Sequence, residues 1–394
     1  MRIGIYLGNY IPPEEGGGAV FQNEVIEELI QQNTSHELYI YYFGKTKPKA
    51  NSSKVTFIQL PSKSLKRFIK RILNLIKDQI TFSLHDVKET YSFLNDLFIR
   101  DEIQFAYFPT PSCFAETEVP FIFTMWDLGD KIHPYFPETS IKNRNFEFRN
   151  TYYSRILPKA TYIFIGNEAG KNQLIKYYQI GEDRIIKNPM ITPNYIYTLK
   201  ADNEVLKKID IQKNKYLFYP AQFWPHKNHI RLLLAMRELS KRGYKLVLTG
   251  SDKGNLGYIR QKVEEFNLSE SVIFTGFVSQ EEIIALYKNA FALCYASIMG
   301  PDNIPPLEAM GLECPVICSE YDGAVEQLEN AALFFNPYDE KEIINAVLQL
   351  EDYNLRDQLI NKGSFLAKKY SIKNYTEVVL KTFDKASEIR ECWE

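Results

Sequence analysis

Short apolar runs alternate with longer amphipathic segments along the whole chain. In the first half, the apolar runs have the length and flanking turn residues of buried strands, and the segments between them carry apolar residues at helical spacing. This β-then-α alternation predicts a parallel sheet covered by helices on both faces. The expected strands are Ile3–Leu7, Leu38–Phe43, Val55–Leu60, Phe105–Phe108, Phe121–Met125 and Tyr162–Gly166, and the expected helices are Ala19–Gln32, Ser64–Lys77 and Tyr91–Arg100.

A second series of the same kind begins at Tyr216, and the Pro-containing, polar stretch 188–214 before it predicts a linker. We therefore expect an α/β chain with two Rossmann-like domains, 1–195 and 210–372, whose parallel sheets face each other across a cleft. The expected strands here are Tyr216–Tyr219, Lys245–Thr249, Ser271–Thr275, Phe291–Tyr295, Val316–Ser319 and Ala332–Phe335, and the expected helices are Asn228–Lys241, Leu256–Phe266, Gln280–Lys288, Pro305–Leu312 and Asp339–Leu350.

Composition narrows the class of protein. The 394 residues suit two domains better than one core. A net charge of −2 gives no reason to expect a nucleic-acid partner, and no apolar stretch has membrane-spanning length. The first residues are typical of a strand rather than a signal peptide, so we expect a cytoplasmic protein with reduced thiols. The scattered cysteines, which lack metal-ligand spacing, are Cys113, Cys294, Cys314, Cys318 and Cys392.

Two loops that follow expected strands could hold a phosphate, because ligands of doubly wound sheets bind at the carboxyl ends of the strands. The run Gly16-Gly17-Gly18 precedes a helix, whose free N–H groups would be open to an anion. It lacks the dinucleotide spacing of glycines, and a flexible turn is the alternative. Lys227 lies between a strand and a helix start, where its charge would add to the helix dipole, and the alternative is a solvated surface lysine.

A third loop leads into a short helix near Pro305. Asn303 is a candidate cap, and Pro305 and Pro306 suit a first helical turn, which would leave backbone N–H groups facing the cleft. Glu308 then falls in or just after that turn. There a buried carboxylate could accept hydrogen bonds from a ribose diol, whereas a lone glutamate in a helix is more often on the surface.

Taken together, these loops resemble the family-4 retaining glycosyltransferases, which have the GT-B fold. The resemblance covers nearly the whole chain, and its most specific part is the end of the family's paired-glutamate motif. The segments that carry it are the glycine loop, Trp126-Asp127-Leu128, the loop Gln222 to Asn228, Val272 to Val278, Asn303 to Met310 and Cys314-Pro315-Val316-Ile317.

The resemblance implies a role for each matched position. Lys227 would bind the diphosphate of a nucleotide-sugar donor, and Glu308 would bind the ribose. Backbone at Asn303 and Ile304 would hold phosphate and sugar, and backbone at Gly276 and Phe277 would touch the base. The resemblance also implies that a final helix, within 374–394, crosses back to the first domain.

Three positions depart from the family pattern. The family's first glutamate falls at Gly300, and Asp302 is a hypothetical substitute for its contact to the donor sugar. Gln222 occupies the position where the family usually has an arginine before the loop lysine. Trp126 occupies the position where the family usually has a histidine before Asp127, and His133 is the nearest histidine after it in the sequence.

The implied reaction transfers a hexosyl group with retention of anomeric configuration through an oxocarbenium-like state. Stabilising the departing diphosphate is its main task, for which Lys227, Gly17 and Gly18 are suited, and Asp127 is the candidate for orienting acceptor or sugar. The chain contains no Asp-x-Asp pair, so we expect neither metal nor cofactor. By resemblance the acceptor would be a glycan or a lipid-linked glycan of a bacterial surface polysaccharide such as O-antigen. The basic amphipathic stretch 62–77 could touch the inner membrane, or be an ordinary helix.

Three other functions fit parts of the pattern. A nucleotide-sugar epimerase would release sugar without an acceptor, and a phosphorylase-like enzyme would need a pyridoxal cofactor. A catalytically silent nucleotide-sugar-binding protein is suggested by Gly300, Gln222 and Trp126, and it would bind donor without turnover.

Overall fold

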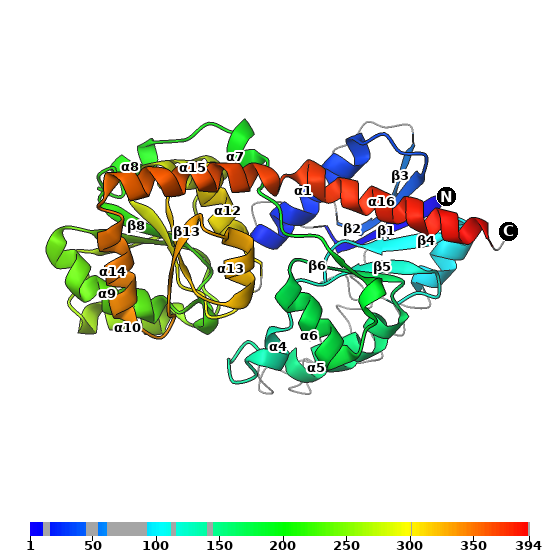
Figure 1. Cartoon of the computed structure of the whole chain (residues 1–394), viewed down its shortest axis with the longest axis horizontal. Helices are drawn as coiled ribbons and strands as arrows, with labels where there is room; N and C mark the ends of the chain where they lie inside the picture. Colours follow the sequence, from blue (N-terminus) through cyan, green and yellow to red (C-terminus); the bar gives the residue numbers. More distant parts are fainter. Residues whose placement is uncertain are drawn as a thin grey trace.

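The computed structural model describes residues 1–10, 16–44, 54–60, 93–111, 116–139, 145–300 and 302–392. It contains two sheets, and every strand pair in both is parallel. Helices flank each sheet, and the two sheet-and-helix units lie end to end (Figure 1). This confirms the expected α/β fold with two Rossmann-like units. The cysteine at position 113 and the stretch 62–77 lie outside the described residues.

The first sheet has seven strands in the order β3-β2-β1-β4-β5-β6-β7. Its central strands β4, β5 and β6 are buried at every position, as apolar runs in a sheet covered on both faces require. All six expected strands are present. The seventh, β7, has three residues and ends in a lysine, too short an apolar run to be recognised. The strands are β1 (Arg2–Asn9), β2 (Glu37–Phe43), β3 (Val55–Gln59), β4 (Phe105–Phe108), β5 (Phe121–Thr124), β6 (Tyr162–Ile165) and β7 (Ile185–Lys187).

The second sheet has six strands in the order β10-β9-β8-β11-β12-β13, all of them expected from the sequence. Cys294 and Cys318, in β11 and β12, are buried free thiols, as expected for core cysteines, whereas Cys392 near the end of α16 is exposed and the same expectation is wrong for it. The strands are β8 (Tyr216–Pro220), β9 (Lys245–Thr249), β10 (Val272–Gly276), β11 (Ala292–Tyr295), β12 (Val316–Ser319) and β13 (Ala332–Phe335).

The helices that flank the sheets match most of the expected ones. Those expected at Ala19–Gln32, Leu256–Phe266 and Pro305–Leu312 form within two residues of these bounds. α13 and α15 were not expected, since one is a short helix with Gly at its second position and the other has many exposed residues. The helices are α1 (Gly17–Gln31), α4 (Gly129–Ile132), α5 (Asn145–Ile156), α6 (Glu168–Tyr178), α7 (Tyr195–Thr198), α8 (Glu204–Lys208), α9 (His229–Leu239), α10 (Leu256–Glu265), α11 (Gln280–Asn289), α12 (Ile304–Gly311), α13 (Asp322–Leu328), α14 (Glu340–Gln349), α15 (Tyr353–Lys369) and α16 (Ile372–Glu391), with the 3-10 turns η3 (Leu157–Lys159), η4 (Glu182–Arg184), η5 (Pro225–Lys227) and η6 (Ser240–Arg242).

Two chain connections join the units. The first runs from β7 through α7 and α8 to β8, and the second runs back from α15 into α16. They meet where Thr192 N donates to Tyr370 O at 2.7 Å and Thr192 pairs with Ser371. α16 then lies along the first unit beside α1 (Figure 1) and buries Val379 and Phe383 in its core. The final helix therefore crosses back as expected.

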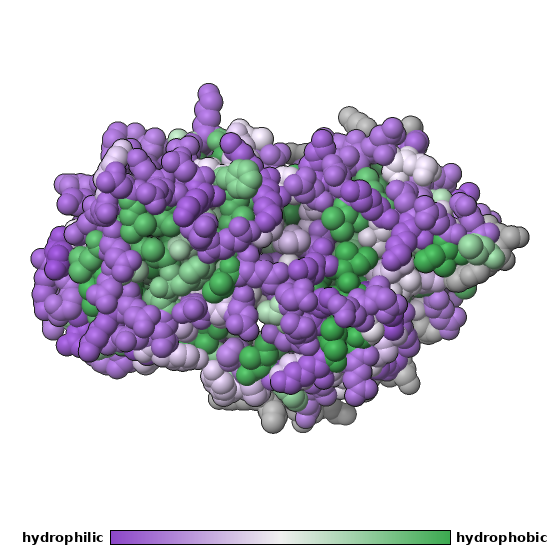
Figure 2. All heavy atoms as spheres, in the orientation of Figure 1, coloured by the Kyte–Doolittle hydropathy of each residue, from purple (hydrophilic) through white to green (hydrophobic). Residues whose placement is uncertain are grey.

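The outer surface is mostly hydrophilic. Figure 2 shows polar and charged residues over most of one face, with apolar patches scattered on both units. Within the described residues, no helix has the length and apolar character needed to cross a bilayer.

Candidate functional site

The glycine loop lies against the second unit. Gly16, at φ +131°, is in a backbone conformation that side chains disfavour. A Cβ on Gly16 would lie 3.6 Å from Nε2 of Gln222, and one on Gly17 would lie 3.7 Å from Cδ1 of Ile304. Among the described residues, no side chain caps the start of α1. The N-terminus of α1 therefore faces the loops after β8 and β11, with its positive dipole end toward them.

Trp126 follows β5 and packs under the same helix. A Cβ on Gly18 would lie 3.0 Å from the Trp126 ring, so only glycine allows this approach without displacement. The Trp126 ring also meets Phe21 edge to face, with centroids 5.7 Å apart. Where the resembled family has a histidine, this chain thus has an aromatic side chain that packs against α1.

Lys227 is the central cation of the site. It ends η5, two residues before α9 begins, as the sequence predicted. Its Nζ donates to the Tyr295 hydroxyl at 2.9 Å, and no carboxylate among the described residues forms an ion pair with it. Burial lowers the pKa of Lys227 to about 8, although Asp127 and Glu138 act in the opposite direction. A half-buried ammonium whose hydrogen-bond partner is a hydroxyl is suited to receive an anion.

Asn303 was expected to cap α12, and this expectation is wrong. It occupies the N-cap position, but its side chain accepts from the Tyr295 hydroxyl at 2.6 Å and donates to Gly300 O and the Tyr321 hydroxyl. These partners outcompete the helix N–H groups for the Asn303 amide. A chain of hydrogen bonds therefore links Lys227 through Tyr295 to the loop before α12.

The start of α12 offers fewer free amides than expected. Pro305 and Pro306 have no N–H, and the Asn303 N–H donates to Oε1 of Gln327 at 3.1 Å. Gln327 also donates to Asn303 O at 3.0 Å, so it clamps this main chain from both sides. In this first turn, the main-chain N–H of Ile304 is therefore the amide that can donate to a ligand.

Glu308 is a buried carboxylate, as predicted, with 8% of the residue exposed. Its Oε1 accepts from the Tyr195 hydroxyl and its Oε2 from the Tyr287 hydroxyl, both at 2.8 Å. Burial raises the pKa of Glu308, and the two hydroxyls partly offset this. Each carboxylate oxygen keeps a second lone pair, so the group can still accept from a ligand hydroxyl.

Asp127 is fixed by an arginine that the sequence did not point to. Its Oδ1 accepts from Gly129 N at 2.8 Å and from Arg149 at 2.9 Å, and the Arg149 Nε lies 3.0 Å from the fully buried Asp130. Burial raises the pKa of Asp127, but the charge of Arg149 and the Gly129 amide outweigh it, so the net pKa is lowered. Asp127 is thus held ionised and rigid, as an orienting group requires.

Acidic side chains also join the two units beside the site. Glu138, from the segment after α4, bonds to both the ring and the main-chain N–H of His226. Glu326 of α13 accepts from the first N–H of α6, at Glu168, at 2.7 Å. Glu24 of α1 accepts from Asn194 and Tyr195 N–H groups. The units are therefore tied by carboxylates placed on main-chain donors.

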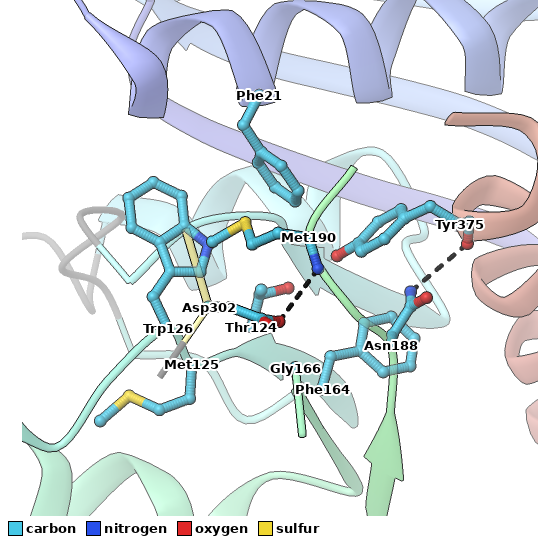
Figure 3. A pocket seen from close by; sticks show the side chains of 10 residues that line it. All are labelled: Phe21, Thr124, Met125, Trp126, Phe164, Gly166, Asn188, Met190, Asp302 and Tyr375. Atoms are coloured by element: carbon cyan, nitrogen blue, oxygen red, sulfur yellow. Dashed lines mark hydrogen bonds between the residues drawn. The ribbon is translucent and has the colours of Figure 1, made fainter. Parts of the chain in front are cut away.

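Asp302 lies at this boundary as well. Its Oδ2 accepts from Met190 N at 3.1 Å and sits against Gly166, where a Cβ would overlap it at 1.6 Å. Burial raises the pKa of Asp302 to about 6. Asp302 lines a cavity of about 10 Å³, which has room for roughly one water. Figure 3 shows Asp302, Trp126 and Asn188 around this cavity. In this arrangement Asp302 contacts the first unit's main chain.

The remaining expected positions lie around the same loops. Gln222 accepts from the Trp224 indole N–H at 3.1 Å, which aims its amide toward Gly16. Gly276 ends β10 at φ +70°, and the Phe277 ring after it is 77% exposed. His133 directly follows α4, with its Nδ1 3.0 Å from the Tyr135 hydroxyl.

Comparison with known proteins adds a family. Residues 202–364 match the glycosyl transferases group 1 family model. The O-antigen chain mannosyltransferase RfbU of Salmonella typhimurium is 27% identical over 245 residues, which cover 62% of this chain and 65% of RfbU. This chain therefore aligns with a little less than two thirds of that relative.

Solved structures share the whole architecture. Sucrose-phosphate synthase from Thermosynechococcus elongatus has a TM-score of 0.73 at 16% identity, covering 98% of this chain and 99% of that one. Anabaena Alr3699/HepE, solved in complex with UDP and glucose, has a TM-score of 0.67 at 14% identity, covering 98% and 100%. Residues 202–364 are thus similar to the glycosyl transferases group 1 family, and the whole chain has the two-domain GT-B fold of these solved structures.

Proposed function

We propose that this protein transfers a hexosyl group from a nucleotide-sugar donor to a glycan or lipid-linked acceptor, with retention of configuration and without a metal or cofactor. The observation that carries the proposal is the half-buried Lys227 ammonium. Lys227 is the last residue of η5 and is linked through Tyr295 to Asn303 at the start of α12. It forms no ion pair with a described carboxylate. A diphosphate supplies the negative charge that such a site lacks.

The proposed chemistry uses charge stabilisation rather than a protein nucleophile. As the bond from the anomeric carbon to the diphosphate breaks, the acceptor hydroxyl oxygen would form the new bond to that carbon and pass its proton to an oxygen of the leaving diphosphate. Lys227 and the N-terminus of α1 at Gly17 and Gly18 would stabilise the charge on the leaving group. Asp127, kept ionised by Arg149, would orient the sugar or acceptor. Glu308 would accept from the ribose hydroxyls through its second lone pairs.

A mannosyl donor and a surface-polysaccharide acceptor are the first candidates. RfbU is described as an O-antigen chain mannosyltransferase, and HepE was solved with UDP, so GDP- and UDP-linked hexoses should be tried before others. We also propose peripheral contact with the inner face of the membrane through the basic amphipathic stretch 62–77. Charge reversal there should reduce binding to anionic vesicles, and unchanged binding would favour an ordinary helix.

A silent binding protein remains the second candidate, because Gly300 stands where the resembled family has a glutamate. Thermal stabilisation by UDP, GDP, ADP, CMP and dTDP and their common sugars tests the binding step. A ligand at about 100 times its dissociation constant should add roughly 2.7 kcal/mol of stability. ¹H NMR of the bound donor then separates the candidates: slow hydrolysis or transfer that retains the anomeric configuration supports the enzyme, and selective binding without turnover supports the silent protein. No stabilisation by any nucleotide would contradict both.

A further inference from the structure

Two exposed tyrosines, one from each unit, lie together near the site. Tyr135 follows α4 in the first unit and is 64% exposed, and Tyr338 follows β13 in the second and is 56% exposed. The Tyr338 hydroxyl contacts the Tyr135 hydroxyl and, after burial, is a cause of the raised pKa of Tyr135. We refer to these two residues as the tyrosine pair.

The tyrosine pair is held in place by its neighbours. The Tyr135 hydroxyl is 3.0 Å from His133 Nδ1, and the Tyr135 ring packs on Phe136 with centroids 4.7 Å apart. The Tyr338 N–H donates to Asn336 Oδ1 at 2.9 Å. Large rings that are exposed yet fixed lose little conformational entropy when a ligand binds them.

Each member of the pair is connected to a direct neighbour of Lys227. Phe136, next to Tyr135, meets the His226 ring at 6.2 Å. Pro337, next to Tyr338, accepts at its carbonyl from the Asn228 side chain at 2.8 Å. His226 and Asn228 are the residues before and after Lys227. Two independent routes therefore place the tyrosine pair close to the proposed diphosphate site.

The described charged or titratable groups beside the pair include His133, Asp339, Glu340 and the exposed Lys341. Burial lowers the pKa of His133, so its ring is neutral at pH 7. Asp339 caps α14 through Lys341 N, and Glu340 pairs with Arg231 at 2.6 Å. Glu340 thus has a cationic partner, whereas Asp339 is bonded to a main-chain N–H, and the two exposed rings form the apolar part of this surface. Neutral sugar rings, whose C–H faces pack on aromatic rings and whose hydroxyls bond to phenols, fit this chemistry.

We propose that the tyrosine pair is a binding subsite for the neutral glycan part of the acceptor, a role that rests on the proposed transferase function. Because one tyrosine comes from each unit, the subsite is complete only when the two units are together as in this structure. The glycan packs on the exposed rings and extends toward Lys227, which leaves its terminal hydroxyl at the donor.

Saturation-transfer NMR on the full-length protein tests the subsite, with mannotriose, maltotriose and cellotriose as probes. We expect the wild type to bind at least one of them, and Tyr135→Ala and Tyr338→Ala each to weaken that binding about fivefold. Tyr135→Trp, which keeps a large ring, should retain most of it. Tyr353→Ala is the matched control, since Tyr353 is 72% exposed on α15 and should not affect binding.

Nucleotide-induced stabilisation, measured on the same proteins, separates the two proposals. Neither tyrosine belongs to the diphosphate site, so the alanine variants should keep the wild-type nucleotide shift. If that shift is present while the wild type binds no probe, or while the variants bind as well as the wild type, the subsite is refuted. Absence of any nucleotide shift together with tyrosine-dependent glycan binding would refute the transferase and keep the glycan site.

Discussion

Lys227→Met should make the folded protein more stable while removing nucleotide binding. The side chain keeps its length and loses its charge. Burial lowers the lysine pKa from 10.5 to about 8, and this difference is a cost of about 3 kcal/mol for keeping the ammonium charged in the folded protein. The hydrogen bond to Tyr295 offsets about 1 kcal/mol, and Tyr295 keeps its bond to Asn303 in the variant. The net gain at pH 7 is therefore about 2 kcal/mol.

The pH dependence gives a second test of the same cost. Between about pH 8 and 10.5 the unfolded wild type keeps a proton that the folded protein has released, so the wild type gains stability with rising pH. Lys227→Met lacks this gain, and its advantage should shrink by about 2–3 kcal/mol from pH 7 to pH 10.

Urea unfolding of both proteins at the two pH values measures this difference, with Lys213→Met, an exposed lysine, as the control. A variant that is less stable than the wild type at pH 7, with the same pH dependence, would refute the reasoning. Full retention of nucleotide stabilisation by the variant would remove Lys227 from the donor site.

Two further substitutions test the carboxylates. Glu308→Gln leaves one acceptor oxygen for the two hydroxyls of Tyr195 and Tyr287, so it should lower the free energy of unfolding by about 2 kcal/mol and weaken nucleotide binding. Unchanged stability and nucleotide affinity would show that Glu308 is not part of the donor site. In the folded protein the pKa of Asp302 is raised to about 6, so this residue contributes stability that is present below about pH 4 and lost as the pH rises through 6. Asp302→Asn should therefore flatten the fall in melting temperature that the wild type shows over that pH range. An identical pH profile for the variant would contradict the burial of the Asp302 charge.

The strands were predictable because local sequence determines them. Phe121–Met125 combines aromatic and β-branched residues, Val316–Ser319 begins with two β-branched residues, and both runs follow a proline and form strands where expected. β7 escaped because its three residues give no pattern, and it is recognisable only by its pairing with β6. The crossing of the final helix was implied by resemblance rather than by its own periodicity.

The positions of the candidate residues in the fold were predictable from the sequence, and their hydrogen-bond partners were not. Lys227 and Glu308 follow strands, and position in the chain was enough to place them. Tyr195 bonds to Glu308 across 113 residues of sequence, and Glu138 bonds to His226 across 88. A local sequence pattern cannot predict such partners. The same long-range contacts explain the wrong expectation for Asn303, whose capping tendency is real but yields to Tyr295 and Tyr321.

Hydrogen–deuterium exchange with and without the donor nucleotide that stabilises the protein tests the central claim most directly. The account places the diphosphate between the glycine loop before α1 and the loops holding Lys227 and Ile304. It therefore predicts slower exchange in peptides covering 16–20, 225–229 and 302–308 together, on both units at once. Protection confined to other parts of the chain, with none in these three peptides, would contradict a donor site built from the two units.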